Sequence, residues 1–251
     1  MKKPLIIITG PTASGKTALS VELAKKVGGE IISADSMQVY RHMDIGTAKI
    51  RLEEMDGVPH HLIDILEPTE DFNVVRFQAL ARAAAEDIYS RGKIPIVAGG
   101  TGFYIQAVLY DIHFDENDDD KSYRTYLEQL AEKHGNLCLH QMLEKVDPAS
   151  AAAIHYNNRK RVIRALEFYK ETGIPISEHN EKESKRISPY NFEYFVLNDA
   201  RSKLYDRIDR RIDIMVEQGL IEEVKALKDQ GYTKDLISMQ GLGYKEILDY
   251  L

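Results

Sequence analysis

The stretch that most constrains the fold lies near the start of the sequence and matches the pattern G-x-x-x-x-G-K-[ST] at every fixed position. It consists of Gly10, Pro11, Thr12, Ala13, Ser14, Gly15, Lys16 and Thr17. Residues 5–8 before it form a short β-branched apolar run, which predicts a buried strand. Residues 17–27 after it repeat apolar side chains at helical spacing. A strand, a glycine loop and a helix in this order predict a loop that binds phosphate groups.

The residue types of this loop explain the prediction. Gly10 and Gly15 lack a Cβ atom, so the backbone can adopt unusual angles and approach a phosphate closely. The positive end of the following helix also favours an anion. Lys16 supplies a charge for the terminal phosphate, and the Thr17 hydroxyl is a candidate ligand for Mg²⁺. The motif therefore predicts a phosphate ester or anhydride as ligand, without specifying ATP.

Composition excludes several classes of protein. The chain has 251 residues and a formal net charge of −7, so we do not expect a general binder of polyanions. Residues 155–211 nevertheless carry 13 Lys and Arg against nine Asp and Glu, which indicates a localised anionic partner. Cys138 is the single cysteine, so neither a disulfide nor a cysteine-based metal site is expected. No apolar run is long enough for a signal peptide or a membrane span, and we expect a cytoplasmic monomer.

Alternating strand and helix patterns predict the fold. Further strands are expected at 31–32, 94–98 and 192–197, and residues 58–64 read as a loop that runs into a short strand. Helices are expected at 73–90 and 103–110. This alternation predicts a parallel α/β sheet of the P-loop type, whose loops converge at the carboxyl ends of the strands. An acidic run at 115–120 marks a boundary, after which the pattern is helical only. We therefore expect an α/β core formed by 1–114 and 190–251, with an all-helical insertion domain at 115–189.

Three kinds of phosphate chemistry compete on this scaffold. A regulatory GTPase would need the patterns D-x-x-G and N-K-x-D, and neither occurs in the chain. A small-molecule kinase remains possible with Asp35 as base, although the strand at 94–98 ends in Gly-Gly-Thr-Gly and not in a carboxylate. In the third kind, the loop holds a departing pyrophosphate while an organic group moves to a nucleophile. The residues of the motif alone leave the last two open.

A succession of stretches along the chain resembles the signatures of the tRNA dimethylallyltransferases. These stretches are the glycine loop, 33–41 (SADSMQVYR), 44–49 (DIGTAK), 59–64 (PHHLID), 99–104 (GGTGFY), 155–167, 211–215 and 219–224. The resemblance covers nearly the whole chain in order. It implies transfer of a dimethylallyl group from dimethylallyl diphosphate to the exocyclic amine of the adenine just 3′ of the anticodon in tRNA. It also implies a requirement for Mg²⁺ and the release of pyrophosphate.

The resemblance assigns roles to particular residues. Lys16 and the glycine loop would neutralise the departing diphosphate, with Arg211, and less strongly Arg207, closing over it. Asp35 would act as general base on the adenine amine, and Thr101 would contact the base or the diphosphate. The alternative roles are a helix cap or an indirect contact with Mg²⁺ for Asp35, and a helix cap for Thr101.

Recognition of tRNA is expected to involve two groups of residues. Asp35, Ser36, Met37 and Gln38 would hold the target base with Thr101, since a Gln amide can bond bidentately to adenine. The insertion would grip the anticodon stem-loop through Arg124, Lys160, Arg161 and Arg164. An ion pair with the neighbouring acidic run is the alternative role for Arg124. The adjacent His60 and His61 are expected to be structural.

Two features depart from the pattern of the family. Residues 155–158 read His-Tyr-Asn-Asn where the family usually has His-Pro-Asn-Asp, so the role of this loop is not carried over. Family members usually continue beyond the stretch 241–246 into a basic helical tail, whereas this sequence ends at Leu251. We expect weaker affinity for tRNA as a result. The alternatives are prenylation of a free adenine nucleotide, which the insertion disfavours, the small-molecule kinase and a non-catalytic P-loop module.

Overall fold

The structure is a computed structural model that describes residues 2–113 and 122–251. The acidic run at 115–120, predicted to mark a boundary, lies outside the described residues. The chain divides into two compact units, which we call the core unit (1–112 and 188–251) and the helical unit (113–187). Among the described residues, no helix is both long enough and apolar enough to cross a bilayer.

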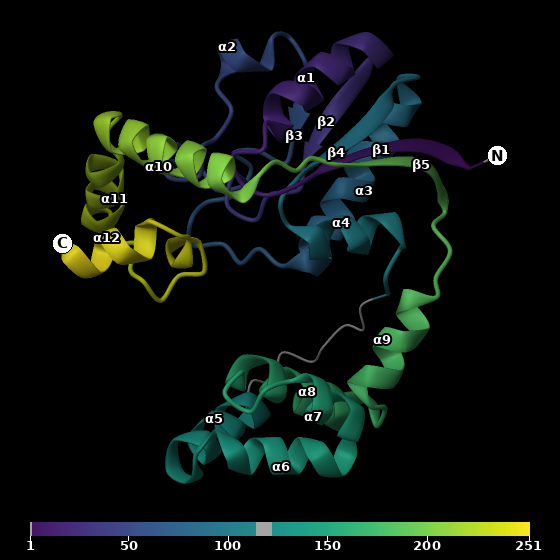
Figure 1. The fold of residues 1–251 in the computed structure, drawn as a ribbon, viewed down its shortest axis with the longest axis vertical. Coiled ribbons are helices and arrows are strands. Elements are labelled where there is room, and N and C mark those ends of the chain that lie inside the picture. Colours follow the sequence, from purple (N-terminus) through teal and green to yellow (C-terminus); the bar gives the residue numbers. More distant parts are fainter. Residues whose placement is uncertain (1, 114–121) are drawn as a thin grey trace. The chain divides into compact units, whose positions relative to one another are not determined.

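The core unit is built on a parallel five-stranded sheet, as predicted (Figure 1). Its strands lie in the order β3-β2-β4-β1-β5, and every neighbouring pair is parallel. Their bounds are β1 Lys3–Thr9, β2 Gly29–Ser33, β3 His60–His61, β4 Ile94–Gly99 and β5 Tyr190–Val196. Because all strands run the same way, the loops after β1, β2 and β4 meet at one edge of the sheet.

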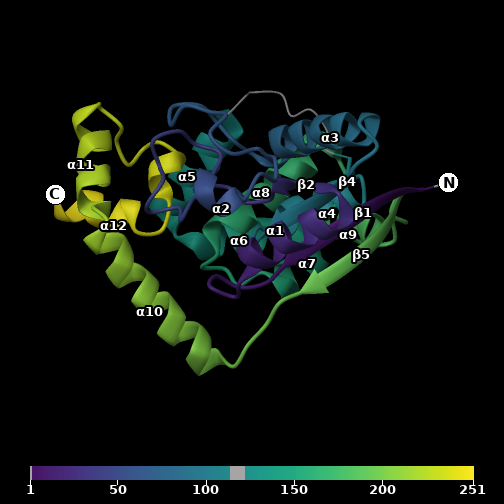
Figure 2. The same ribbon diagram turned by 90° about the horizontal axis from the view of Figure 1, so that it is seen from above.

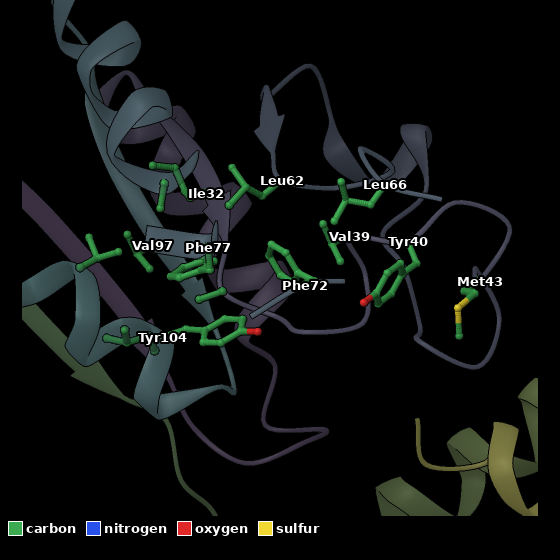
Figure 3. Packing of buried hydrophobic residues seen from close by; sticks show 14 of the residues in the cluster. Ile32, Val39, Tyr40, Met43, Leu62, Leu66, Phe72, Phe77, Val97 and Tyr104 are labelled. Atoms are coloured by element: carbon green, nitrogen blue, oxygen red, sulfur yellow. The ribbon is translucent and has the colours of Figure 1, made fainter. Parts of the chain in front are cut away.

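Helices cover the two faces of this sheet with different hydrophobic clusters. Ile7 belongs to a cluster with Phe77 and Tyr104, which come from α3 (Val74–Ser90) and α4 (Gly102–Leu109). Figure 3 shows the rings of Phe77 and Tyr104 in this cluster. Ile8 instead packs with Val21 of α1 (Lys16–Val27). Successive strand residues point to opposite faces, so this alternation follows from strand geometry. A short helix, α2 (Leu52–Met55), lies in the connection between β2 and β3.

The last part of the core unit is helical. After β5 come α10 (Arg201–Glu217), α11 (Leu220–Asp229), a 3₁₀ turn η1 (Ser238–Gln240) and α12 (Tyr244–Tyr250). Figures 1 and 2 both show α10 leading away from the end of β5, with α11 and α12 grouped at its far end. In α10 only Leu204 is buried, while Ile212 and Ile214 are each 50% exposed.

The helical unit has a hydrophobic core of its own, whose buried members are Leu127, Leu139, Leu143, Val162, Ile163, Leu166 and three alanines. Its helices are α5 Ser122–His134, α6 Asn136–Val146, α7 Pro148–Ala153, α8 Arg159–Thr172 and α9 Ile176–Ser184. The buried Asp147 caps α7 by accepting a hydrogen bond of 2.9 Å from the Ser150 N–H. It also accepts bonds from the N–H and hydroxyl of Ser177, which attach α9 to the unit.

Candidate active site

The glycine loop connects β1 to α1, as the motif predicts. Gly10 has φ +149° and Gly15 has φ +88°, angles that favour glycine. A Cβ atom on Gly10 would also lie only 2.3 Å from the carbonyl oxygen of Leu197. Gly15 caps α1 without a side-chain hydrogen bond, so the side chains leave the first N–H groups of the helix for a ligand. This geometry is suited to an anion.

Two polar side chains of the glycine loop, those of Ser14 and Lys16, form no hydrogen bond with another side chain among the described residues. The Ser14 hydroxyl is buried, yet it has no hydrogen-bond partner among the described residues. Lys16 Nζ donates only to carbonyl oxygens, at 2.9 Å to Gly10 and 2.7 Å to Pro11. Burial lowers the pKa of Lys16, a shift that the carboxylate of Asp35 opposes and the charge of Arg211 reinforces. The loop therefore holds a hydroxyl and an ammonium group that an anionic ligand would satisfy.

Asp35 follows β2 and lies within electrostatic range of the loop. Its Oδ1 accepts the N–H groups of Met37 at 2.8 Å and Gln38 at 3.2 Å, which fixes the carboxyl group against its own turn. Burial lowers the pKa of Arg211, and Asp35 opposes this shift as it does for Lys16. Within the described ranges, no side-chain nitrogen of a lysine, arginine or histidine lies within 4.0 Å of the Asp35 carboxylate oxygens. The structure thus brings together the predicted base, lysine and arginine without neutralising them.

Thr101 follows β4 at the same edge of the sheet. Its backbone N–H donates to the carbonyl oxygen of Ala34 at 3.2 Å, which places the loop after β4 against the residue before Asp35. A Cβ atom on Gly99 would lie 2.2 Å from that same oxygen, so this close approach requires glycine. Thr101 occupies the cap position of α4, but its hydroxyl makes no capping bond. The alternative prediction of a helix-cap position is therefore confirmed, although no side-chain capping bond accompanies it.

Two arginines on α10 face the glycine loop. Arg207 donates to the Ala13 carbonyl oxygen at 3.4 Å and pairs with Asp199 at 2.7 Å. Arg211 lies one helical turn further on and is partly buried. The sequence prediction preferred Arg211 for the diphosphate. Among the described residues Arg211, unlike Arg207, forms no ion pair with a carboxylate, which is consistent with that preference.

The residues after Asp35 differ from the prediction in one respect. The Gln38 amide nitrogen donates to the carbonyl oxygens of Thr47 (3.2 Å) and Ala48 (3.3 Å), and its oxygen accepts from the Ser33 hydroxyl (3.4 Å). A bidentate contact with adenine would need an amide that is not already engaged, so in this arrangement Gln38 supports the 44–49 loop instead. Ser36 and Met37 are partly buried.

No role was predicted from the sequence for Glu223, although this residue lies in the stretch 219–224, which resembles the family. Its carboxylate accepts the backbone N–H groups of Asp44 (2.9 Å), Ile45 (2.8 Å) and Gly46 (3.2 Å). The Tyr244 hydroxyl donates to the same carboxylate at 2.5 Å. The stretches 44–49, 219–224 and 241–246 therefore meet in one hydrogen-bonded cluster. In the sequence, the only sign of this cluster is that all three stretches are present.

The same cluster explains a glycine and a lysine of the 44–49 loop. A Cβ atom on Gly46 would lie 2.5 Å from the ring of Tyr244. The Lys49 side chain is only 5% exposed, and its Nζ donates to the Tyr40 carbonyl oxygen at 2.7 Å and to Asp44 at 2.5 Å. Lys49 also pairs with Asp64. These contacts hold the loop rigidly beside α10 and α11.

The helical unit contains the other residues that the sequence predicted to contact RNA. Lys160, Arg161 and Arg164 are exposed on α8. Arg124 is held differently, because its guanidinium makes a bidentate ion pair with Glu167, with distances of 2.8 and 2.7 Å. The alternative foreseen for Arg124 was an ion pair with the acidic run, and the observed partner is Glu167.

His60 and His61 are bound within the protein, as the structural interpretation expects. His60 Nδ1 lies 2.8 Å from the Val58 carbonyl oxygen, and His61 Nε2 lies 2.8 Å from the buried Glu30 carboxylate. Over the described parts of the chain, no group of three or more His, Cys, Asp or Glu side chains could hold a metal ion.

A parallel sheet with a glycine loop, an unpaired lysine and a carboxylate at its carboxyl edge defines a P-loop protein that acts on a phosphorylated substrate. A family model described as IPP transferase matches residues 38–251, and one described as isopentenyl transferase matches residues 3–65. The chain therefore belongs to the tRNA isopentenyltransferase, or dimethylallyltransferase, family, which confirms both the resemblance and the enzyme class, a transferase.

Individual relatives agree with the family models. A tRNA dimethylallyltransferase from Lachnoclostridium phytofermentans is 61% identical over 249 residues, which cover 99% of this chain and 80% of the relative. The crystal structure of a tRNA isopentenylpyrophosphate transferase from Bacillus halodurans is 51% identical, with a TM-score of 0.71, over 100% of this chain and 77% of that one. A eukaryotic dimethylallyltransferase acting on tRNA is 35% identical, with a TM-score of 0.84, over 99% of this chain and 63% of that one.

Proposed function

We propose that this chain transfers the dimethylallyl group of dimethylallyl diphosphate to the exocyclic amine of the adenine 3′ to the anticodon in tRNA. In this reaction the bond between C1 and the diphosphate oxygen breaks, and a bond between the amine nitrogen and C1 forms. The amine proton passes to a base, and pyrophosphate leaves. The observation that supports the proposal is that the charges of Lys16, Asp35 and Arg211 influence one another, while among the described residues the three side chains form no ion pair.

The loop is suited to stabilise the leaving group. Lys16 Nζ, which now bonds two carbonyl oxygens, can turn to the diphosphate, and Arg211 can approach from α10. The Ser14 hydroxyl and the first N–H groups of α1 add hydrogen bonds to the phosphate oxygens. Positive groups already aimed at the developing negative charge are a large source of catalysis.

Asp35 is suited to take the proton from the amine. Its Oδ1 accepts hydrogen bonds from two backbone N–H groups, while its Oδ2 accepts none from the described residues. A carboxylate held in this way presents one oxygen in a fixed direction, which a general base requires. The Thr101 hydroxyl, which makes no capping bond, lies in the adjoining loop and is proposed to contact the target base or the diphosphate.

A magnesium ion fits these residues. The Thr17 side chain is exposed in the first turn of α1, where its hydroxyl can serve as a ligand. Mg²⁺ usually keeps several waters and binds through phosphates with few protein groups, so the lack of a larger acidic cluster in the described residues is compatible with it. When bound, the ion would neutralise charge on the diphosphate.

Recognition of tRNA is proposed for the helical unit. Residues 148–166 include four basic side chains and no acidic one, and Lys160, Arg161 and Arg164 among them are exposed. Contacts with phosphates would fix the anticodon stem-loop, while the target base is unstacked to reach the core unit. A free nucleotide would need no such unit, which favours tRNA as substrate.

One assay separates the candidate functions. The chain is incubated with radiolabelled dimethylallyl diphosphate and either unmodified tRNA or AMP, and in a third arm with γ-labelled ATP and small hydroxyl acceptors. We expect label in the tRNA, at the adenine after the anticodon, and equimolar pyrophosphate. Label in AMP alone would favour an adenylate prenyltransferase, and γ-phosphate transfer alone would favour a kinase.

A further inference from the structure

The 44–49 loop has a backbone conformation that its own residues disfavour. Ala48 has φ +47°, and His42 just before the loop has φ +64°, both in the left-handed region that is costly for a residue with a Cβ atom. Such angles persist where neighbouring groups enforce them. Here Glu223 of α11 accepts the N–H groups of residues 44–46, and the Gln38 amide donates to the carbonyl oxygens of residues 47 and 48. The loop is therefore a fixed link between α11 and the turn after β2.

One side of this link leads to Asp35. The backbone N–H of Gln38 donates to Asp35 Oδ1 at 3.2 Å, while the Gln38 side-chain amide holds the loop. The N–H of Met37 donates to the same carboxylate oxygen at 2.8 Å. A Cβ atom on Gly241, in the segment before α12, would lie 2.6 Å from the methyl carbon of Met37. A displacement of the loop or of this segment would therefore move the turn that holds the Asp35 carboxylate.

The other side of the link leads to Arg211. The N–H of Glu223 donates to the carbonyl oxygen of Gly219 at 2.9 Å, so Glu223 lies in the first turn of α11, soon after the end of α10. Arg211 lines a pocket together with Ile45 and Lys49 of the loop. The face of α10 that carries Arg211 therefore lies beside the loop that Glu223 holds.

We propose that Glu223 is a positioning residue for the transfer reaction, because its hydrogen bonds to the 44–49 loop determine where α10 holds the Arg211 guanidinium relative to Asp35. The inference rests on the function proposed above and adds a residue that does not touch the substrate. Among the described residues Arg211 forms no ion pair, although Asp35 and Lys16 lie within electrostatic range. Its place is therefore set by the helix that carries it, and Glu223 acts on the departing diphosphate through Arg211.

The hydrogen bonds of Glu223 require a carboxylate. Its Oε2 accepts the N–H groups of Asp44 (2.9 Å) and Ile45 (2.8 Å). Its Oε1 accepts the N–H of Gly46 (3.2 Å) and the hydroxyl of Tyr244 (2.5 Å). A glutamine at this position would direct its NH₂ group at one of these two pairs of donors. The substitution therefore releases one part of the loop while it keeps the bulk of the side chain.

The first test compares two neighbouring glutamates. Glu223→Gln removes the carboxylate that holds the loop, whereas Glu222→Gln removes the same charge from an exposed position in the same first turn of α11. The Kd of pyrophosphate is measured by titration calorimetry, and the kcat of transfer to tRNA at saturating substrates. We expect Glu223→Gln to raise the Kd about tenfold and to lower kcat by about 10–100-fold, the effect of a misplaced group at a reacting centre. Glu222→Gln should change neither.

A double-mutant cycle separates positioning from a purely structural role. Arg211→Gln alone should raise the Kd of pyrophosphate about tenfold or more, because a charge-assisted bond to the diphosphate is lost. Since Glu223 acts through Arg211, adding Glu223→Gln to this variant should raise the Kd by less than about twofold further. A residue that only stabilised the fold would produce the same fold-change in both backgrounds. Pyrophosphate binding needs no tRNA, so the cycle tests Glu223 whichever acceptor the chain uses.

A milder variant keeps the test independent of any loss of stability in Glu223→Gln. Tyr244→Phe removes one of the four bonds to Glu223 and keeps the ring that lies against Gly46. It should raise the Kd of pyrophosphate about threefold in the unmodified chain and leave it unchanged in Arg211→Gln. Equal fold-changes in both backgrounds, or none in the unmodified chain, would overturn the inference while the proposed function stands. An unchanged Kd in Arg211→Gln alone would overturn the diphosphate contact assigned to Arg211 in the proposed function, and the inference with it.

Discussion

Strand β2 has an acidic residue at each end, and the two are held in opposite ways. Glu30, near the start of the strand, is fully buried and is bonded by Arg91, Lys93 (2.8 Å) and His61 (2.8 Å). Asp35, just after the end of the strand, bonds only to backbone N–H groups, although Lys16 and Arg211 lie within electrostatic range. At the amino edge of the sheet, the buried carboxylate is paired with basic side chains of the protein itself. At the carboxyl edge, the charged side chains form no such pairs among the described residues, which leaves them available to a ligand.

The largest effect is expected on turnover, from replacing Asp35 just after the end of β2. Asp35→Asn keeps an oxygen that can accept the two backbone bonds but removes the base. Turnover should fall by about 10²–10⁴-fold, the usual contribution of a general base. The Kd of pyrophosphate should change little, and its measurement by titration calorimetry serves as the control. Turnover near that of the unmodified chain would exclude Asp35 as the base.

Replacing Glu30, near the start of β2, should lower the stability of the protein. Glu30→Gln leaves Arg91 and Lys93 without their anion, and the free energy of unfolding should fall by about 3 kcal/mol, the lower end of the range for breaking a buried pair, because both cations are partly exposed. Urea denaturation measures this change, and pyrophosphate binding by the folded variant should be retained. An unchanged midpoint would show that this cluster does not stabilise the core unit.

The same residue predicts a dependence on pH. The hydrogen bond from Arg91, followed by those from Lys93 and His61, lowers the pKa of Glu30 from 4.5 to about 2. The unfolded chain therefore takes up the proton first, and the stabilisation is complete above pH 4.5 and lost as the pH falls toward 2. Over this interval the unfolding free energy of Glu30→Gln should fall less steeply than that of the unmodified chain. Parallel curves would contradict the assigned pKa.

The same contrast between paired and exposed charges applies to the basic residues of the helical unit. Arg124 is paired with Glu167, whereas Lys160 and Arg161 are exposed and form no ion pair with the acidic residues that the structure describes. Replacing Lys160 and Arg161 by Gln should reduce the slope of log affinity for tRNA against log salt by about 1–2, because up to two phosphate contacts are lost. The matched control replaces Lys182 of α9 and Lys185 directly after it, which pair with acidic residues one turn away. Equal slopes in both double variants would separate α8 from RNA binding.

The smallest effect concerns the buried hydroxyl of the loop. Ser14→Ala removes an oxygen that has no hydrogen-bond partner in the described protein, so the stability should not fall. Pyrophosphate should bind more weakly by about 0.5–1.5 kcal/mol, the net value of one hydrogen bond. Ser20→Ala is the control, since its buried hydroxyl bonds the Thr17 carbonyl oxygen at 2.8 Å within α1. It should lower the stability without that loss of affinity.

The sequence predicted the sheet and the glycine loop because both depend on local patterns. The strand before residue 10 and the helix after residue 15 are marked by apolar periodicity and by glycines that the loop geometry requires. The position of Asp35 at the same edge also follows from the strand pattern, because the carboxyl ends of parallel strands meet there. The role of Thr101 came from the family resemblance, and the roles of both residues stay predictions. Arg211 came from the family resemblance, because no local pattern distinguishes it from other arginines of its helix.

Contacts between distant segments could not be predicted in the same way. Gln38 was expected to face the substrate, but two carbonyl oxygens of the 44–49 loop engage its amide. Glu223 and Tyr244 bind that loop over a separation of about 180 and 200 residues, which no periodicity reports. Which partner satisfies a polar side chain depends on tertiary packing, and this decides whether the residue is available to a ligand.

The most direct test of the account is a crystal structure of the chain with an unreactive analogue of dimethylallyl diphosphate. The account predicts that the diphosphate lies in the glycine loop, with Lys16 Nζ bonded to its terminal phosphate and Asp35 Oδ2 on the opposite side of C1. A structure in which the loop instead enclosed ATP, with its terminal phosphate directed at an acceptor hydroxyl and the analogue bound elsewhere, would contradict it.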